Sequence, residues 1–518
     1  MSGETTGNAA QAVLDDGLRA FGEGRPVEAA GAFAKAAALT PEIAAPHLNL
    51  GVALKALGRL GEALDAFDRA LEIDCDWAEA HYNRANVLNA LGRSGDAEAA
   101  LRRAIGLKPD FAGAWNNLGL LLAAGGRFDE AVAAYRQALT GDLEKPEILN
   151  NLGNALQALD RLAEAEEVLR RALDLAPGDG RLHLNLGGVL QDQGALDAAA
   201  AAYGRAVSLC PEDVDARLRL AMLTLLTGDL KAGFDAYEWR WRDSGFIEGE
   251  RHRRAPGWTG EDLKGKRLLL WAEQGFGDAI QFARFAALTA ARGAEVVVEC
   301  PKPLVRLFET LTCVAAVTEP GLDDGDFDFQ APLMSLPLTL GVTLETIPAA
   351  PYLFSEVQAG RREKLPAVDL DGGLNVGLVW AGGKSHKNDR KRSLDPALLE
   401  PLTSLTGLPG VNFFSLQAAA KETPPGVASL APVADFAETA ALISGLDLVI
   451  SVDTAVAHLA GALGRPVWIM LPFAPDWRWL RGRDDSPWYP TARLFRQRSP
   501  GDWPGVVEAL GRALARFA

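Results

Sequence analysis

The sequence predicts an α + α/β protein, in which an array of helical repeats precedes two α/β domains. A 34-residue period runs through roughly the first 245 residues and then stops. Beyond it, apolar strand-like segments alternate with helix-like segments, a pattern typical of parallel sheets with helices on both faces. The chain has 518 residues, of which 48% are hydrophobic and 23% charged, so it has the length and composition of a soluble protein with several domains.

Several columns of small residues keep the 34-residue register. Small residues let two helices approach closely, glycine suits the turn between them, and proline ends the second helix. The columns resemble tetratricopeptide (TPR) repeats over residues 1–245, six in number with a degenerate seventh near Tyr237 and Arg240. The resemblance implies a superhelix with a concave binding surface. The glycine column, interrupted once by Asp160, comprises Gly58, Gly92, Gly126, Gly194 and Gly228; the alanine columns begin at Ala29 and Ala36, and the proline column at Pro41.

An asparagine recurs at the same spacing, at Asn49, Asn83, Asn117, Asn151 and Asn185. By register each lies in the middle of a helix, where asparagine is a mediocre helix former, so an offsetting role is expected. A side-chain amide can both donate to and accept from a peptide backbone, whatever the side chains of that peptide. The array resembles that of the O-GlcNAc transferases, whose superhelix carries such an asparagine ladder along its inner face. We predict that these five ladder asparagines bind an extended polypeptide; a purely structural column is the alternative.

The composition disfavours some classes of binding partner and predicts the cellular location of the protein. The formal charge of −16 disfavours a general nucleic-acid or anionic-membrane binder. Residues 1–11 are polar and lack the basic and apolar regions of a signal peptide, and no apolar run approaches the length of a membrane span, which predicts a cytoplasmic protein. The four cysteines form no metal-type pair, and His47, His81 and His183 share one repeat position, which indicates a structural role.

Two α/β units follow the array. The polar residues 246–265 predict a connector, and residues 361–374 predict a linker between the units 266–360 and 375–518. In the first unit we expect strands at 267–273, 294–299, 314–318 and 327–331, with a glycine-rich turn at 274–278 that opens a helix through 291. In the second unit we expect strands at 375–380, 411–416, 446–451 and 466–471, and helices at 396–404, 436–444, 454–463 and 503–517. Such units predict two facing Rossmann-like domains with a cleft between their strand ends.

The turn Gly275-Phe276-Gly277-Asp278 has competing interpretations. A dinucleotide-binding fingerprint would require a glycine at position 280, where Ile280 stands, although Glu299 ends the second strand as a ribose-binding acid would. Asp278 at the mouth of the first helix can instead act as a general base toward an acceptor hydroxyl. An N-cap aspartate without a chemical role is the structural alternative.

The loop at 380–393 gathers cations at the carboxyl end of the first strand of the second unit. Its glycines permit close backbone approach, and its cations can neutralise a phosphate or diphosphate leaving group. A solvated charged loop is the alternative, but the position in the expected crevice favours anion binding. The candidate residues are Gly382, Gly383, Lys384, Lys387, Arg390, Arg392 and Ser393.

A third candidate element is the strand end and helix start at 451–458. Asp453 and Thr454 can bond to a sugar or ribose, and the free amides of the helix start, at Ala455, can face phosphate. His458 lies one helical turn after Thr454 and can therefore face the same cleft. A helix cap and a satisfied helix histidine are the alternatives. Gln417, just after the strand at 411–416, can contact the base or the sugar.

In their order along the chain, these three elements resemble glycosyltransferase family 9, the heptosyltransferases and their relatives, over roughly residues 266–518. The resemblance implies the GT-B fold, with Asp278 as the catalytic carboxylate and with the basic loop and the 451–458 segment binding the nucleotide sugar. Ala455 stands where the family has glycine. The segments 472–479 and 486–490 are similar to a TPR-fused bacterial subset of these enzymes.

Together the resemblances imply a metal-independent protein O-glycosyltransferase. The nucleotide sugar would be a co-substrate, without a further cofactor, and the acceptor would be Ser or Thr of a polypeptide held by the TPR array, with flagellin or another bacterial surface protein as the expected substrate. Asp326 and Asp328 offer a weaker, metal-dependent alternative near a predicted strand. The rival functions are transfer to a lipopolysaccharide or polysaccharide acceptor, and a TPR scaffold with an inactive transferase domain.

Overall fold

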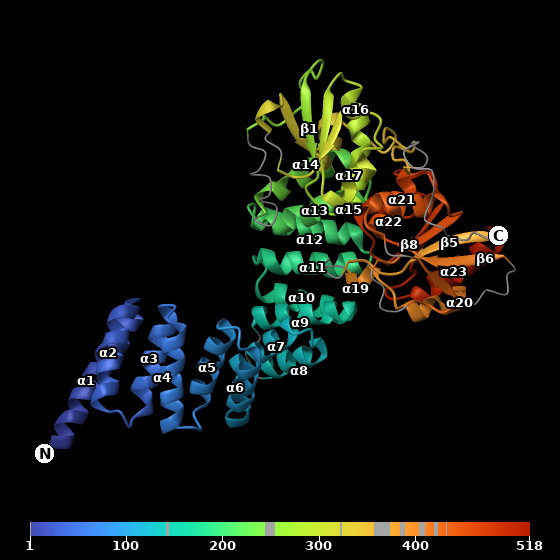
Figure 1. Cartoon of the computed structure of the whole chain (residues 1–518). Helices are drawn as coiled ribbons and strands as arrows, with labels where there is room; N and C mark the ends of the chain where they lie inside the picture. Colours follow the sequence, from blue (N-terminus) through green and yellow to red (C-terminus); the bar gives the residue numbers. More distant parts are fainter. Residues whose placement is uncertain are drawn as a thin grey trace. The chain divides into compact units, whose positions relative to one another are not determined.

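The computed structural model describes residues 2–140, 145–243, 254–321, 324–356, 373–383, 389–403, 410–418, 423–430 and 433–517. The chain divides into two compact units, Met1–Val189 and Leu190–Ala518. The described part of the first unit is helical, and the second unit contains further helices and two parallel sheets (Figure 1). The predicted α + α/β class is therefore confirmed. None of the described helices combines the length and the hydropathy that crossing a membrane requires.

The first unit is a run of helical hairpins, in which each helix from α1 to α10 packs against its neighbours along the chain (Figure 1). The small-residue columns lie at these contacts, since Ala29, Ala63 and Ala97 are completely buried. The helices are α1 (Ser2–Gly22), α2 (Pro26–Leu39), α3 (Ala44–Ala56), α4 (Leu60–Ile73), α5 (Ala78–Ala90), α6 (Ser94–Leu107), α7 (Ala112–Ala124), α8 (Phe128–Ala138), α9 (Pro146–Ala158), α10 (Leu162–Leu175) and α11 (Gly180–Asp192), whose last residues belong to the second unit.

The glycine column forms the turns between paired helices. Gly58 and Gly92 have φ angles of 73° and 75°, in the left-handed region that a side chain disfavours. Asp160, the one interruption in the column, adopts the same region with φ 56°, because a short polar side chain tolerates it better than most. The turn geometry is therefore preserved at the position where glycine is missing.

Hydrogen bonds at the repeat junctions account for two of the three recurring histidines, His81 and His183. His81 Nε2 donates to the Cys75 carbonyl at 2.9 Å, and His183 Nε2 donates to the Pro177 carbonyl at 3.1 Å. Each bond ties a side chain in the first helix of a repeat to the backbone just before that helix. The structural role expected for His81 and His183 is confirmed.

The first sheet of the second unit has four parallel strands in the order β3-β2-β1-β4, all in the predicted segments. The described part of the connector runs beside β4, where the Trp258 amide donates to the Gln330 carbonyl at 2.8 Å. The elements up to the end of this domain are α12 (Leu196–Leu209), α13 (Val214–Leu226), α14 (Leu230–Tyr237), η1 (Glu238–Arg242), β1 (Arg267–Trp271), α15 (Phe276–Phe282), η3 (Ala283–Phe285), α16 (Ala286–Ala290), β2 (Glu295–Glu299), α17 (Lys302–Phe308), β3 (Ala316–Thr318), η4 (Asp324–Asp326), β4 (Phe329–Pro332), η5 (Leu333–Ser335) and α18 (Leu336–Leu340).

The second sheet has six parallel strands in the order β10-β9-β8-β5-β6-β7. The four central strands occupy predicted segments, whereas the edge strands β7 and β10 were not predicted. Most of the predicted linker at 361–374 lies outside the described residues. The elements are β5 (Leu374–Val379), α19 (Asp389–Arg392), η6 (Pro396–Leu399), α20 (Glu400–Thr403), β6 (Val411–Ser415), β7 (Val427–Ser429), α21 (Phe436–Ser444), β8 (Leu448–Val452), α22 (Ala455–Ala462), β9 (Val467–Leu471), η8 (Trp477–Trp479), β10 (Ala492–Arg496) and α23 (Trp503–Phe517).

The helix predicted at 396–404 is present through residue 403, but its first turn is not α-helical. A 3-10 turn, η6, starts there and is followed by the short helix α20. Asp395 caps the 3-10 turn by accepting from the Ala397 amide at 2.9 Å. Pro401 explains the break, because it has no N–H to donate to the preceding turn of a continuous α-helix.

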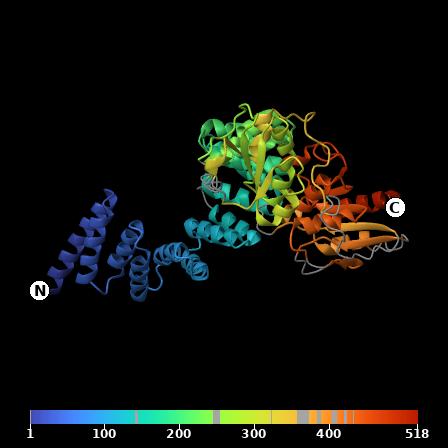
Figure 2. The ribbon, with the colours of Figure 1, turned by 45° about the horizontal axis from the view of Figure 1, so that its top comes forward.

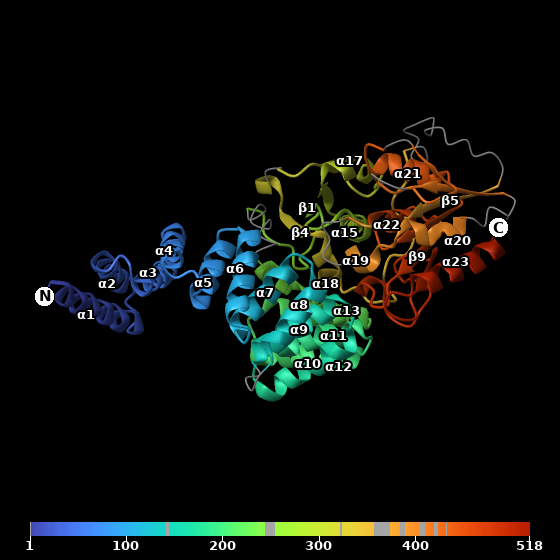
Figure 3. The same ribbon diagram turned by 90° about the horizontal axis from the view of Figure 1, so that it is seen from below.

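Helices cover both faces of the second sheet. Helices α20 and α23 pack on one face, where Leu402 and Leu510 join the core with strand residues such as Ile450 (Figure 3). Helices α21 and α22 lie on the other face (Figure 3). The first sheet, in yellow-green, and the second sheet, in orange and red, form separate domains of this unit (Figure 2).

A buried arginine joins these two domains of the second unit. Arg284, 1% exposed, donates to the Trp488 carbonyl at 2.6 Å and to the Pro348 carbonyl at 3.1 Å. Helix α15 of the first domain also packs on α22 of the second. The start of α15 and the start of α22 are thereby brought together, which positions the site described next.

Candidate functional site

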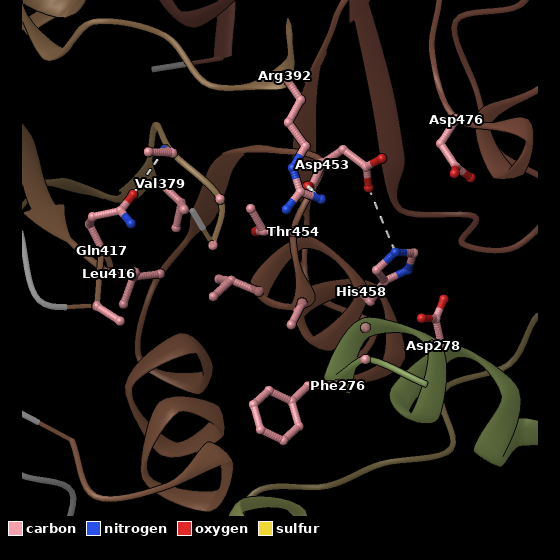
Figure 4. A pocket seen from close by; sticks show the side chains of 18 of the residues that line it. Phe276, Asp278, Val379, Arg392, Leu416, Gln417, Asp453, Thr454, His458 and Asp476 are labelled. Atoms are coloured by element: carbon pink, nitrogen blue, oxygen red, sulfur yellow. Dashed lines mark hydrogen bonds and ion pairs between the residues drawn. The ribbon is translucent and has the colours of Figure 1, made fainter. Parts of the chain in front are cut away.

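A cavity of about 1480 Å³ lies within the second unit, where the carboxyl ends of strands from both sheets meet. The turn after β1 forms part of its wall, together with the residues that follow β5, β6 and β8. This is the crevice in which parallel α/β sheets bind their ligands. The predicted candidates in the wall are Asp278, Arg392, Gln417, Asp453, Thr454 and His458, all labelled in Figure 4, together with Gly382, Gly383 and Ala455.

Asp278 is the third residue of α15, and Gly275 occupies the N-cap position. The N-cap interpretation of Asp278 is therefore wrong. Its carboxylate instead accepts from Arg478, a side chain that is only 9% exposed. Arg478 also donates to Asp476 Oδ1 at 2.8 Å and to Gln281 Oε1 at 2.7 Å, so its guanidinium group is held on three sides. This arrangement orients the Asp278 carboxylate within the cavity wall.

The dinucleotide interpretation of the same turn finds no support in the position of Glu299. Glu299 is 4% exposed and accepts from the Gly321 amide at 3.2 Å. It does not line the cavity. The acid expected to bind a ribose therefore stabilises the end of β2 and the loop after β3 instead.

Gly277 lets the turn pack tightly against α22. A Cβ atom at this position would lie 3.1 Å from Cδ2 of His458. The His458 ring is buried, stacks on Trp479 with 5.3 Å between ring centroids, and has Nδ1 3.0 Å from the Tyr489 hydroxyl. Burial, together with the charge of Arg478, lowers the pKa of His458 well below its ordinary value, so the ring is neutral at pH 7. The His458 ring, which is uncharged and has a polar partner in Tyr489, thus fixes the spacing between α15 and α22.

Asp453 follows β8 and lies near His458, with 3.8 Å between its Oδ1 and His458 Nε2 (Figure 4). Burial, and next the charge of Asp476, raise the pKa of Asp453 to about 6. Arg392 donates to the Asp453 carbonyl at 3.1 Å and so links the basic loop to the start of α22. Thr454 is the N-cap residue of α22, but its hydroxyl lies 3.0 Å from the Ser451 hydroxyl and makes no capping bond.

The basic loop is only partly described. Lys384 and Lys387 lie outside the described residues, and Arg390 is not part of the cavity wall. Ser393 has a structural role, since its hydroxyl accepts from the Gly382 amide and donates to Asp389 Oδ1, both at 2.9 Å. Gly382 packs closely against Arg392, because a Cβ atom there would lie 2.5 Å from a guanidinium nitrogen and would displace that side chain.

Gln417 anchors the end of β5. Its side-chain oxygen accepts from the Trp380 amide at 3.2 Å and from the Ala381 amide at 2.9 Å (Figure 4). The residue lines the cavity, on the side formed by the ends of β5 and β6. Gln417 therefore helps to hold this part of the cavity wall in place.

The ladder asparagines belong to the first unit and are half-buried. Their side-chain amides form bonds between successive repeats: Asn117 donates to Asn86 at 2.7 Å, Asn151 to Asn116 at 3.1 Å, and Asn185 to Asn150 at 2.6 Å. Asn83 donates to the Glu79 carbonyl at 2.9 Å. These bonds use one N–H of the amides of Asn83, Asn117, Asn151 and Asn185, and each of these amides has a second N–H. The side-chain oxygens of Asn83 and Asn117 also accept, from Lys55 Nζ and from Asn116 Nδ2, both at 3.3 Å.

Sequence reasoning missed several residues of the cavity wall. Asp476 and Arg478 lie in the 472–479 segment, which was noted only as a resemblance, and no local signal tied them to Asp278. Helices α11 and α13 also contribute to the wall, with Gln191, Asp192, Arg219, Met222 and Leu226. The 34-residue register could have pointed to Arg219, because it continues from Asn185 to that position.

Comparison with known proteins gives one type of match for the N-terminal array and another for part of the second unit. A family model described as glycosyltransferase family 9 (heptosyltransferase) matches residues 414–470, which include Gln417, Asp453 and His458 but not Asp278. A model described as the C-terminal domain of cilia and flagella-associated protein 70, a TPR type, matches residues 1–222. The chain therefore combines a TPR-type array with a part similar to glycosyltransferase family 9.

Protein FlbA of Caulobacter vibrioides is 32% identical over 333 residues, which cover 58% of this chain and 54% of FlbA. The chain thus spans about half the length of this curated relative. Among solved structures, Pseudomonas aeruginosa PilF is 20% identical with a TM-score of 0.38, covering 42% of this chain and 99% of its own. YrrB, described as a TPR protein with an unusual peptide-binding site, is 22% identical with a TM-score of 0.31, covering 35% of this chain and 92% of its own.

Proposed function

We propose that the protein is a glycosyltransferase of the GT-B type that moves a sugar from a nucleotide-sugar donor to a serine or threonine hydroxyl of a polypeptide. The TPR-type array captures the acceptor, for which flagellin or another bacterial surface protein is the expected class, and the proposed site of action is the cytoplasm. The observation that carries the proposal is one cavity that joins Asp278 to the strand ends of the second sheet. Such strand ends bind nucleotides in parallel α/β proteins.

Asp278 is the proposed general base. Its carboxylate takes the proton of the acceptor hydroxyl while the hydroxyl oxygen forms a bond to the anomeric carbon of the sugar. The bond between that carbon and the phosphate oxygen of the donor breaks, and its electron pair leaves with the nucleotide. Arg478, held by Asp476 and Gln281, supports this role because it keeps the carboxylate in one orientation.

Positive charge for the departing phosphate comes from the basic loop and the start of α22. Arg392 lines the cavity and contacts the backbone at Asp453. Lys384 and Lys387 would join it, and the free amides near Ala455 offer further donors. Because these groups can neutralise the leaving group, the proposed mechanism requires no metal ion.

A polypeptide acceptor is favoured by the array. The ladder asparagines place amide groups at regular spacing along the array. A small cavity of about 140 Å³ is lined by one of them, Asn117, and by Asn86 and Leu120 among others. Leu120 is 45% exposed, so an apolar contact is available next to polar ones. A surface of this kind suits an extended peptide chain.

A glycan acceptor is the second candidate, because the matching family model is described by its heptosyltransferases. The deciding experiment incubates the purified chain with a panel of nucleotide sugars and either polypeptide or glycan acceptors, and measures intact mass. A mass increase on a polypeptide that matches one sugar is the expected result. Transfer confined to glycan acceptors would refute the protein-directed proposal, and no transfer to either class would favour the inactive scaffold.

A further inference from the structure

The ladder column continues beyond its last asparagine. Thirty-four residues after Asn185 stands Arg219, and Arg219-Leu220-Ala221 parallels Asn185-Leu186-Gly187 in the previous repeat. The column therefore changes from an amide to a guanidinium group in helix α13. A neutral amide forms hydrogen bonds of modest strength with many kinds of polar group, whereas a guanidinium group pairs with carboxylates through two parallel, charge-assisted bonds.

Arg219 lines the same cavity as Asp278. Met222 and Leu226, one and two helical turns further along α13, line it as well. Gln191 and Asp192, at the end of α11, complete this part of the wall. Helices that carry the repeat register thus form one side of the proposed catalytic cavity.

The immediate contacts of Arg219 leave it able to bind a ligand. Its side chain is 45% exposed, its Nε donates to Asp215 Oδ2 at 2.9 Å within the same helix, and it also interacts with the hydroxyl of Tyr203 on α12. Asp215 is 59% exposed, and such exposed pairs contribute less than about 1 kcal/mol, so a ligand carboxylate can compete with it. Asp192, the acid that α11 contributes to the wall, is paired with Lys391 at 2.6 Å.

We propose that Arg219 is a specificity-determining residue that binds an aspartate or glutamate side chain of the acceptor polypeptide, close to the serine or threonine that receives the sugar. The identity of the ligand as a polypeptide rests on the proposed function. Half-buried Met222 supplies an apolar surface for the aliphatic part of the bound side chain. The acceptor is therefore selected by one charged contact in the cavity in addition to backbone contacts with the ladder.

The test is a binding selection that needs no sugar donor. The full chain is immobilised and exposed to a biotinylated library of peptides with a central serine and randomised flanking residues. Wild type should enrich peptides with Asp or Glu at one flanking position, and Arg219→Asn, which restores the ladder residue, should lose that preference and bind the selected peptide about 10-fold or more weakly. Arg219→Glu should favour Lys or Arg at the same position.

The matched control is Arg205→Asn, an exposed arginine on α12 that does not line the cavity. This variant should select the same peptides as wild type. An unchanged preference in Arg219→Asn, or the absence of any peptide retained by wild type, would overturn the inference. Selected acidic peptides that never accept sugar would instead refute the proposed function and leave the role of Arg219 intact.

Discussion

At the scale of single residues, the cavity depends on a few side chains with defined partners. Asp278 was predictable because a glycine-rich turn before a helix is a local pattern. Arg478 was not, because its contact with Asp278 spans 200 positions of the sequence. No periodicity or spacing links two such residues, and only the packing of the two domains brings them together.

Asp278→Asn should remove the proposed base while keeping the shape of the side chain. General-base catalysis contributes about 100- to 10,000-fold, so we expect transfer to fall by that factor. Product formation with a polypeptide acceptor is the measurement. Asp485→Asn, an aspartate 66% exposed and paired with Arg483, is the control and should keep the wild-type rate. A variant at 278 with an undiminished rate would exclude Asp278 as the base.

Glu273 makes a pH-dependent contribution to stability. Burial raises its pKa from 4.5 to about 7, even though Arg240 donates to it at 3.1 Å. The folded state then holds a proton that the unfolded state releases above about pH 4.5, so the stabilisation is complete below that pH and is lost as pH rises to 7. A shift of this size corresponds to a loss on the order of 3 kcal/mol.

Glu273→Gln keeps the acceptor oxygen but cannot titrate, so its melting temperature should fall less between pH 5 and pH 8 than that of wild type. Calorimetry at several pH values compares the two slopes. Parallel curves for wild type and variant would show that Glu273 has the same pKa in the folded and unfolded chain.

At the scale of elements, features that follow from local sequence were predictable, whereas features that depend on contacts distant in the sequence were not. The turns of the array follow from a glycine column because each needs only one residue with positive φ. The edge strand β10 was missed because Arg493 and Arg496 interrupt its apolar pattern and it pairs only with β9. The strand exists because Leu494 and Phe495 are buried by the rest of the domain, which is information from packing.

The close approach of paired helices gives a test in the array. A Cβ atom at Gly119 would lie 2.5 Å from the buried ring of Tyr135, so Gly119→Ala should destabilise the first unit by about 1–3 kcal/mol through overpacking. Gly106→Ala, at an exposed helical site with no atom within 4 Å, should stabilise it slightly. Thermal unfolding followed by circular dichroism measures both. Equal effects of the two substitutions would contradict the packing argument.

At the scale of the whole molecule, the sequence predicted the order of the parts and the change from one period to another. The division into compact units falls at residue 189, inside the last ladder-bearing helix, whereas the repeat register runs on into α13. The sequence period thus shows how many repeats follow one another. The packing of the chain shows that the final repeats belong to the unit that contains the cavity.

The joint action of array and cavity predicts a separation of functions. With Asn83, Asn117 and Asn151 all changed to alanine, transfer to a polypeptide should fall at least 10-fold while hydrolysis of the donor continues. Asn150→Ala is the control, because it removes the buried partner of Asn185 at 2.6 Å without changing a ladder residue. It should lower the melting temperature but retain transfer. Undiminished transfer in the folded triple variant would leave the ladder with a structural role only.

The long span between Asp278 and Arg478 has a consequence for the timing of synthesis. Repeats contact their neighbours along the chain, so the array can fold as it leaves the ribosome. At about 5–20 residues per second, Arg478 follows Asp278 about 10–40 s later. On the proposed function, a nascent chain can hold an acceptor polypeptide during that interval, while Asp278 still lacks the arginine that orients it. On the proposed function, acceptor capture can begin during translation, whereas sugar transfer requires that almost the entire polypeptide has been made.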